Sequence, residues 1–245
     1  MCNRFHVRTN LHDICKHLDA QATFDFDIPE EVFPLAPAPT LAINRDGMRE
    51  IRPMTFGMGG DSGKGKGGPR YLLNNTRIES RTKWPWKTPF EKYRCVVPMT
   101  SFREPCYWGE TAGTEVSFSP TKDKLLLAAA IFSFKQEPNQ EPDLRMSLVM
   151  RPALPYVMEH GHHRSPFFLR NDGLDAWMDR SPRSADQSIE VLREFAYEPP
   201  LTHRVDRQMA ASWTKRKSAN LKKRDEQLAD IEKIGPLGFA STPDP

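Results

Sequence analysis

Several features of secreted and membrane proteins are missing from this sequence of 245 residues. No apolar run is long enough to span a bilayer, and no segment has the pattern of a secretory signal peptide. The four cysteines form no CxxC pair and lack the spacing of a disulfide framework. We therefore expect free thiols in a reducing compartment and no membrane association. That compartment is the cytoplasm for a bacterial or phage-encoded chain, or the nucleus for a eukaryotic one.

Charge and hydrophobicity are also modest. The net charge of +3 is too small to indicate nucleic-acid binding by itself, so the distribution of the arginines matters more. The hydrophobic fraction of 38% is low and the 22 prolines are many, which predicts a loop-rich fold with short elements. Apolar runs at 93–98, 115–119 and 125–134 predict strands, and we expect helices at 10–18 and 182–194. This mixture indicates an α+β fold with a sheet-rich core and short peripheral helices.

The chain changes character after Trp213. Six basic residues crowd one short stretch, which precedes an acidic helix-like segment and a proline-ended tail: Lys215, Arg216, Lys217, Lys222, Lys223 and Arg224. We expect residues 1–213 to form the folded domain and residues 214–245 to form a basic, solvated tail outside its core. Non-specific binding of this tail to a nucleic-acid backbone is an open alternative.

The glycine- and lysine-rich segment Gly57–Gly68 has part of the pattern of a phosphate-binding loop. Gly60 and the pair Gly65-Lys66 have the right spacing, but Gly67 stands where a Ser or Thr would hold magnesium. We interpret the segment as a basic surface loop instead.

Cys2 directly follows the initiator methionine, and this position is chemically unusual. Cysteine is small enough for Met1 to be removed, which would leave Cys2 with a free α-amine and a thiol on adjacent carbons. Their reference pKa values, about 7.7–8.0 and about 8.5, leave both groups partly nucleophilic near neutral pH. Such a 1,2-aminothiol condenses with an aldehyde and closes a thiazolidine ring. The alternative is an accidental second residue on a frayed terminus.

Three further segments offer the groups that aldehyde capture by an amine requires. Asn75 and Arg77 lie two residues apart and would face the same way on an extended segment. Glu104 follows a predicted buried strand and turn, and His162 lies in a group of three histidines after a predicted helix. Amide, carboxyl and imidazole groups orient an amine and transfer protons. The alternatives are a polar loop, a surface glutamate and a metal site. Because the histidines lack partners at metal-site spacing, we expect no metal and no cofactor.

In their order along the chain, these segments resemble the SRAP family (SOS-response-associated peptidase), whose members are abasic-site sensors of bacteria, phages and eukaryotes. The resemblance covers roughly residues 1–180; each block alone is weak, but the ordered set with an N-terminal cysteine is specific. The blocks that match the family's motifs are Met1-Cys2-Asn3-Arg4-Phe5, Leu35-Ala36-Pro37, Phe56-Gly57-Met58, Asn75-Thr76-Arg77-Ile78-Glu79, Arg94-Cys95-Val96-Val97-Pro98, Ser101-Phe102-Arg103-Glu104-Pro105 and His162-His163-Arg164-Ser165-Pro166.

The resemblance implies a barrel-like α+β sheet crossed by a basic groove, and a specific chemistry. SRAP proteins bind single-stranded DNA and form a thiazolidine with the ring-opened aldehyde of an abasic site, which shields the lesion from strand cleavage. On this basis Cys2 is the crosslinking residue and Asn75 orients its amine and the sugar. Glu104 and His162 are the implied proton-handling pair. The implied phosphate contacts come from three arginines: Arg4, Arg77 and Arg164.

The family name also carries a peptidase activity, which here would be self-removal of Met1, beside Schiff-base chemistry of the lyase type. We expect a monomer whose partner is single-stranded DNA that contains abasic sites. The chain departs from the family's motifs at four positions: Asn3 replaces a glycine, Arg103 and Pro105 replace aromatic residues, and Ser165 replaces methionine. These departures keep a non-covalent DNA-binding module as an alternative. An amidotransferase with an N-terminal cysteine nucleophile, which also begins Met-Cys, is the other.

Overall fold

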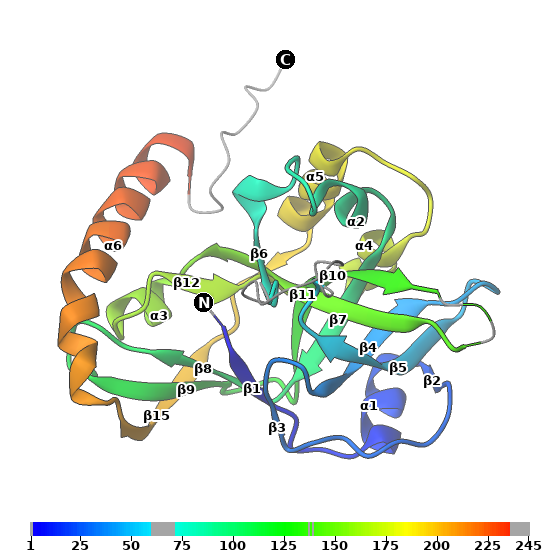
Figure 1. Cartoon of the computed structure of the whole chain (residues 1–245), viewed down its shortest axis with the longest axis horizontal. Helices are drawn as coiled ribbons and strands as arrows, with labels where there is room; N and C mark the ends of the chain where they lie inside the picture. The colour runs from blue at the N-terminus through cyan, green and yellow to red at the C-terminus, as the bar shows by residue number, and fades with distance from the viewer. Residues whose placement is uncertain (1, 60–71, 137, 139, 236–245) are drawn as a thin grey trace.

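The computed structural model describes residues 2–59, 72–136, 138 and 140–235. Its centre is a closed ring of five strands, each hydrogen-bonded to two neighbours (Figure 1). In ring order these are β4 (Pro37–Ile43), β5 (Arg49–Phe56), β11 (Asp143–Pro152), β10 (Leu126–Lys135) and β7 (Arg94–Met99). Only the contact between β5 and β11 is parallel within this ring. Closure into a barrel removes the exposed edges that an open sheet would leave.

Five short strands extend the barrel at its rims, and two of them share a partner. Both β6 and β12 pair with β11, the former in parallel and the latter antiparallel. The short strands are β2 (Gln21–Ala22), β6 (Asn75–Arg77), β12 (Arg164–Pro166), β13 (Phe168–Leu169) and β14 (Ala196–Tyr197). Residues from two distant parts of the sequence are thereby held against one strand.

A second, antiparallel sheet of five strands packs against the barrel. Its strands in spatial order are β15 (Leu201–Gln208), β9 (Thr114–Pro120), β8 (Ser101–Pro105), β1 (Arg4–His6) and β3 (Glu31–Val32). The first strand of the chain is therefore an inner strand, paired with β8 on one side and β3 on the other. This pairing ties the N-terminal segment to the middle of the sheet.

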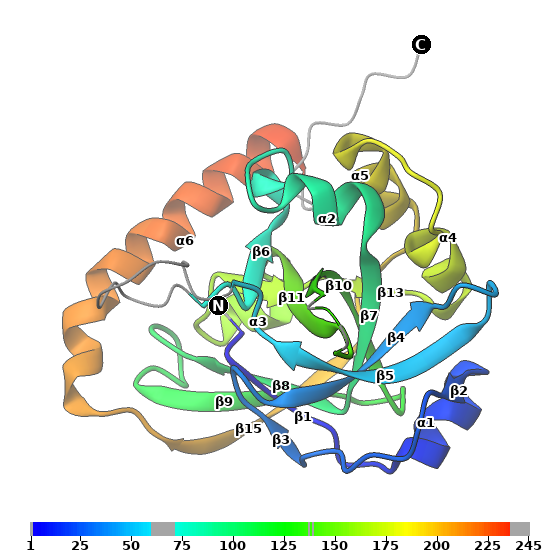
Figure 2. The same ribbon diagram turned by 45° about the vertical axis from the view of Figure 1, so that its right-hand side comes forward.

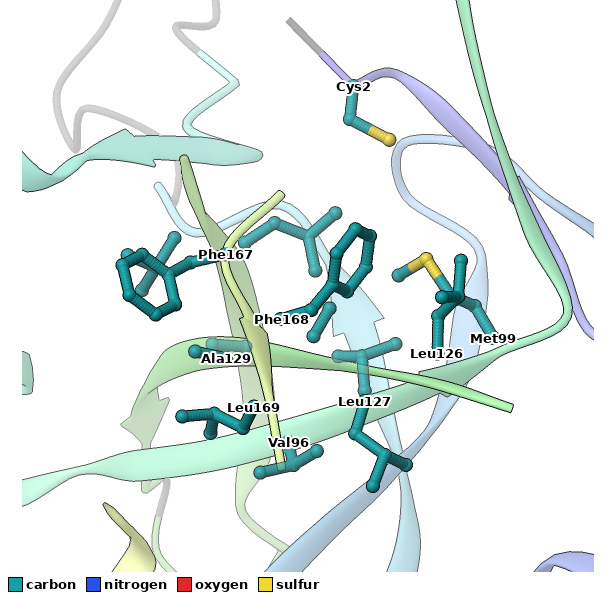
Figure 3. Packing of buried hydrophobic residues seen from close by; sticks show 14 of the residues in the cluster. Cys2, Val96, Met99, Leu126, Leu127, Ala129, Phe167, Phe168 and Leu169 are labelled. Carbon is teal, nitrogen blue, oxygen red and sulfur yellow. The ribbon is translucent and has the colours of Figure 1, made fainter. Parts of the chain in front are cut away.

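Aromatic side chains join the barrel to the second sheet. Phe102 of β8 stacks on Phe118 of β9 at 5.3 Å between ring centroids and meets Phe168 of β13 at 5.5 Å. Phe5 of β1 meets Phe56 of β5 edge to face at 5.3 Å. Figure 3 shows Cys2 at the edge of the buried hydrophobic cluster that includes Phe168. Such fully buried aromatic pairs contribute about 0.5–1.5 kcal/mol each beyond the burial of their area.

The helices lie around the sheets (Figure 1). Five are short: α1 (Leu11–Leu18), α2 (Lys87–Lys92), α3 (Pro155–Glu159), α4 (Leu174–Met178) and α5 (Ala185–Glu194). The sixth, α6 (Thr214–Ile234), is far longer and runs along one side of the molecule. Figure 2 shows the start of β1 between α6 and the barrel. Among the described residues, no helix is both long and apolar enough to cross a membrane.

The predicted α+β class and barrel-like, sheet-rich core are confirmed. The structure differs from the sequence analysis after Trp213, where one continuous helix includes the basic stretch as well as the acidic segment. Neither Gly nor Pro interrupts residues 214–234, so intrinsic helix propensity explains the extension. The division of the chain at residue 213 stays a prediction. Most of the Gly57–Gly68 segment lies outside the described residues.

Candidate functional site

Cys2 lies just before β1 and is completely buried. Its thiol donates to the carbonyl of Arg4, with 3.4 Å between Sγ and the oxygen. Burial raises the pKa of the thiol above its ordinary value, and the nearby charge of Glu104 raises it further. The thiol is therefore protonated at neutral pH.

Two neighbouring asparagines hold the first residues of the chain. Asn75 Nδ2 donates to the carbonyl of Cys2 at 2.8 Å. Asn74 Nδ2 donates to Asn3 Oδ1 at 2.7 Å. Both asparagines are buried, since β6 pairs with β11 directly behind them. The Asn3 side chain, which the sequence analysis singled out as a departure, is thus an acceptor for this pair.

Glu104 comes to Cys2 through the pairing of β1 with β8. The register places Arg4 opposite Arg103 and Phe5 opposite Phe102. Because side chains alternate along a strand, Phe102 and Glu104 share the buried face of β8 while Arg103 lies on the other. The Glu104 side chain is fully buried.

His162 reaches the same place from a turn after α3. Gly161 in this turn has φ +100°, and a Cβ there would lie 2.4 Å from the carbonyl oxygen of Trp108. The Gly161 carbonyl also accepts from the backbone N–H of Tyr107 at 2.8 Å. A glycine is therefore required where the chain turns His162 inward.

His162 and Glu104 form a buried acid–base pair. The distance from His162 Nδ1 to Glu104 Oε2 is 3.1 Å. Burial raises the pKa of Glu104 to about 7 and lowers the pKa of His162 well below its usual range. Near neutral pH Glu104 can therefore release or take up a proton beside a neutral His162, an arrangement that suits proton transfer.

Arg164, which the sequence analysis expected at a phosphate, is buried behind this pair. Its guanidinium binds the carboxylate of Glu79 through two hydrogen bonds, one of them 3.0 Å long. The Gln227 side chain of α6 accepts from Arg164 Nε at 2.8 Å and from Nη2 at 3.0 Å, and its amide donates to the carbonyl of His163. The hydrogen bonds of Arg164 and Gln227 therefore stabilise the segment that carries His162.

The other two predicted arginines lie at the surface around the site. Arg77 is exposed on β6. Burial lowers the pKa of His163 to about 3, and the charges of Arg164 and Arg77 lower it further. Arg4 lines a cleft of about 510 Å³ together with Asn3 and Glu104. Glu104 and the two residues that follow Cys2 thus line a space that also has basic side chains in its walls.

The remaining walls of this cleft are also rich in arginine. Arg103, Arg207 and Arg216 line it, with Glu115 among them. Arg103 is itself held by carboxylates, since Nη1 lies 2.8 Å from Glu31 and Nε lies 2.7 Å from Asp206. Four arginines against two glutamates leave the cleft net positive, which suits an anionic ligand.

A larger surface depression, of about 960 Å³, lies between the hairpin of β4 and β5 and the end of α4. It contains none of the predicted site residues. Its arginines Arg49 and Arg180 are bonded to Asp175 and to the carbonyl of Asn44. Among the described residues, no three His, Cys, Asp or Glu side chains group closely enough to hold one metal ion. The smaller cleft is the candidate site because Glu104 lines it together with Asn3 and Arg4, which directly follow Cys2.

Cys2, Asn75, Glu104 and His162 are therefore brought together, although they are spread over 160 positions of the sequence. Sequence reasoning missed Asn74 and Arg207. Asn74 stands next to Asn75, so its hydrogen bond to Asn3 had no separate signal. Arg207 enters the cleft only because β15 pairs with β9.

Comparison with known proteins agrees with this architecture. The family model "SOS response associated peptidase (SRAP)" matches residues 1–212. Three solved structures share the fold at low identity. A Bordetella bronchiseptica protein is 15% identical with a TM-score of 0.67, covering 84% of this chain and 100% of its own. A phage-related protein from the same organism is 20% identical with a TM-score of 0.66, covering 84% and 95%. A Bacteroides thetaiotaomicron protein is 15% identical with a TM-score of 0.64, covering 84% and 92%. No curated protein matches the chain.

The fold and the site define a protein with a small barrel, a packed second sheet and a cysteine-centred site at the start of the chain. Because the family model matches residues 1–212, the chain belongs to the SRAP family. The description of that family associates it with the SOS response and names it as a peptidase.

The raised pKa of Glu104 predicts a pH-dependent contribution to stability. Because the folded-state pKa of about 7 exceeds the ordinary value of 4.5, the folded state holds this proton more tightly. The contribution is complete below about pH 4.5 and is lost as the pH rises through 7. Chemical denaturation of the wild type and Glu104→Gln should therefore show a difference in unfolding free energy that shifts by on the order of 3 kcal/mol across this window. Glu110→Gln, at an exposed position, is the control. A difference in unfolding free energy between Glu104→Gln and wild type that does not change with pH would contradict the assignment.

The turn before His162 predicts a second effect on stability. Gly161→Ala should reduce the free energy of unfolding by about 2–4 kcal/mol, because a Cβ collides with the Trp108 carbonyl in addition to the cost of positive φ. Gly47→Ala is the matched control, since Gly47 also has positive φ but nothing lies within 4 Å of its Cβ position. Equal losses in both variants, measured by urea denaturation, would argue against the close approach at Gly161.

Proposed function

We propose that this protein captures abasic sites in single-stranded DNA as a covalent thiazolidine at Cys2. The observation that carries the proposal is the meeting of Cys2, Asn75 and the buried Glu104–His162 pair beside a basic cleft. An N-terminal aminothiol, a group that orients it and a proton shuttle are the three requirements of this chemistry. Because the solved structures are of low sequence identity, they support the fold alone. The proposed activity therefore rests on the arrangement of the site residues.

The reaction begins with hydrolysis of the peptide bond between Met1 and Cys2, which consumes one water and releases the α-amine of Cys2. This step fits the peptidase name of the family. Asn75, which holds the carbonyl of Cys2, fixes the position of the backbone that carries the new amine. Without this step the Cys2 nitrogen is an amide and cannot act as a nucleophile.

The amine then adds to the C1 aldehyde of the ring-opened deoxyribose to give a carbinolamine. Loss of one water, with a proton supplied to the departing hydroxyl, gives a Schiff base. Protonated Glu104 is the suitable acid, because its pKa is raised to about 7 by burial. His162, neutral at this pH, relays the proton between Glu104 and the sugar.

Ring closure completes the crosslink. The Cys2 sulfur bonds to the imine carbon, the C=N double bond becomes single, and the thiol proton passes to nitrogen. The raised pKa of the thiol favours this order, because a protonated sulfur leaves the first attack to the amine. The net change is loss of one water from amine, aldehyde and thiol, and no cofactor is consumed.

The crosslink is tested with a single-stranded oligonucleotide that contains one abasic site. Wild-type protein should give an adduct that survives a denaturing gel. Cys2→Ser should give an adduct only after borohydride reduction, because its amine forms a Schiff base but its hydroxyl closes no thiazolidine. Cys15→Ala, a half-buried cysteine on α1, should behave as wild type. A wild-type adduct whose protein retains Met1 by mass spectrometry would overturn the mechanism, and glutamine hydrolysis without DNA would support an amidotransferase instead.

The proton-transfer roles predict a bell-shaped pH profile for the rate of adduct formation. The rate should rise as the amine loses its proton near 7.7–8.0 and fall as Glu104 loses its own through about 7, so that the maximum lies between about 7 and 8. Glu104→Gln should slow the reaction by roughly a hundredfold and lose the alkaline limb. His162→Ala should slow it without weakening DNA binding. Unchanged rates in both variants would remove the assigned roles.

A further inference from the structure

The helix α6 lies beyond the part of the chain that the family model matches. The family match ends at residue 212, and α6 covers residues 214–234. Its 21 residues give it a length of about 31 Å. Both views show it alongside the region where β1 begins (Figures 1 and 2).

Polar and aromatic contacts hold α6 against the domain. Gln227 is its buried residue and binds Arg164 and the His163 carbonyl. The guanidinium of Arg224 lies 5.4 Å from the centre of the Trp108 ring. At the start of the helix, the Trp213 ring packs on Gly113, where a Cβ would lie 2.9 Å away. These contacts fix both halves of α6 along the site, and the half-buried Leu221 and Ile231 lie on the same side of the helix.

Charge is distributed along α6 in the order that opposes helix formation. The segment 214–224 holds six basic residues and no acidic one, whereas residues 225–232 hold four acidic ones. The first turn of a helix favours negative charge, and each misplaced charge costs about 0.3–1 kcal/mol there. Such an arrangement points to a partner of negative charge that offsets the cost.

Four of the basic residues share one side of the helix. Positions i, i+1, i+7 and i+8 fall within about a third of the helical circumference. These residues are Lys215, Arg216, Lys222 and Lys223, and all four are exposed. Two turns separate the pairs, which is about 10 Å along the axis.

This basic side continues the wall of the candidate cleft. Arg216 lines the cleft together with Glu104, Arg4 and Arg207. Arg216 also lies close enough to Tyr107 for its charge to act on the phenol, whose pKa is raised by burial and lowered by Arg216. Tyr107 in turn meets the His162 ring edge to face. A polyanion bound in the cleft at Glu104 would therefore extend directly along the basic side of α6.

We propose that Lys215, Arg216, Lys222 and Lys223 of α6 form a phosphate track for the strand that flanks the lesion. The proposal rests on the proposed function, because it takes the occupant of the cleft to be single-stranded DNA. The track contacts the sugar–phosphate backbone and carries no base specificity. It extends the site beyond the domain that the family shares.

The test compares salt dependence of binding to a lesion-free single-stranded oligonucleotide. In the variant K215Q/R216Q/K222Q/K223Q, the slope of log K against log salt concentration should fall by up to about 2.8, since each phosphate contact on single strands contributes about 0.7. Affinity at 0.1 M salt should fall by roughly tenfold or more. The melting temperature should stay equal or rise, because Lys215 and Arg216 lie in the first turn, where positive charge opposes the helix. A lower melting temperature would assign these residues to folding and overturn the proposal.

The control variant removes the same charge from exposed lysines on other elements, as K16Q/K92Q/K122Q/K124Q. A slope that falls equally in both variants would show a net-charge effect and overturn the track. Binding of wild type to phosphatidylserine vesicles that is lost in the α6 variant, with the DNA slope unchanged, would overturn it in favour of a lipid surface.

Adduct formation is measured in parallel at low salt and saturating protein. The variant K215Q/K222Q/K223Q, which keeps the cleft residue Arg216, should still form the abasic-site adduct there, because its Cys2, Glu104 and His162 are intact. A wild type that forms no adduct while the α6 variant loses its salt slope would refute the crosslink and support the track. Normal adducts with an unchanged slope would refute the track alone.

Discussion

The strand β11 is the constraint on which the site depends. Along its ten residues it bonds to β5 and β10 of the barrel, and also to the short strands β6 and β12. Asn75 begins β6, and His162 lies two residues before β12. One rigid backbone therefore sets the distance between two segments almost ninety positions apart, and pairing of β1 with β8 adds Cys2 and Glu104.

Burial shifts the pKa values of the site residues, at the cost of removing polar groups from water. A carboxyl group and an imidazole are placed together where water is excluded, which brings the pKa of Glu104 to about 7 and keeps His162 neutral. On a surface, the same residues would titrate near their ordinary values and transfer protons less effectively at neutral pH. The neighbouring Arg164–Glu79 pair and Gln227 stabilise the segment that holds the histidine.

Much of the fold was predictable, because strands such as 94–99 and 126–135 are continuous apolar runs in a barrel buried on its inside. The helix α6 was harder to place. Its docked face mixes Arg224 and Gln227 with the half-buried Leu221 and Ile231, so the many charged residues around it gave its sequence the pattern of a solvated helix. The sequence also contained no indication that Arg164 would be buried, because the carboxylate and the amide that surround it come from distant segments.

The sequence by itself determined the family, and it indicated the candidate site residues and the aminothiol that Met1 removal would expose, because these follow from residue identity and order. Only the tertiary structure decided which groups share a proton, which arginines face the cleft and which one is buried. These properties depend on distance and on exclusion of water, and both arise from strand pairing between distant segments. The pairing of β1 and β6 with their neighbouring strands brings Cys2 together with the other residues of the candidate site.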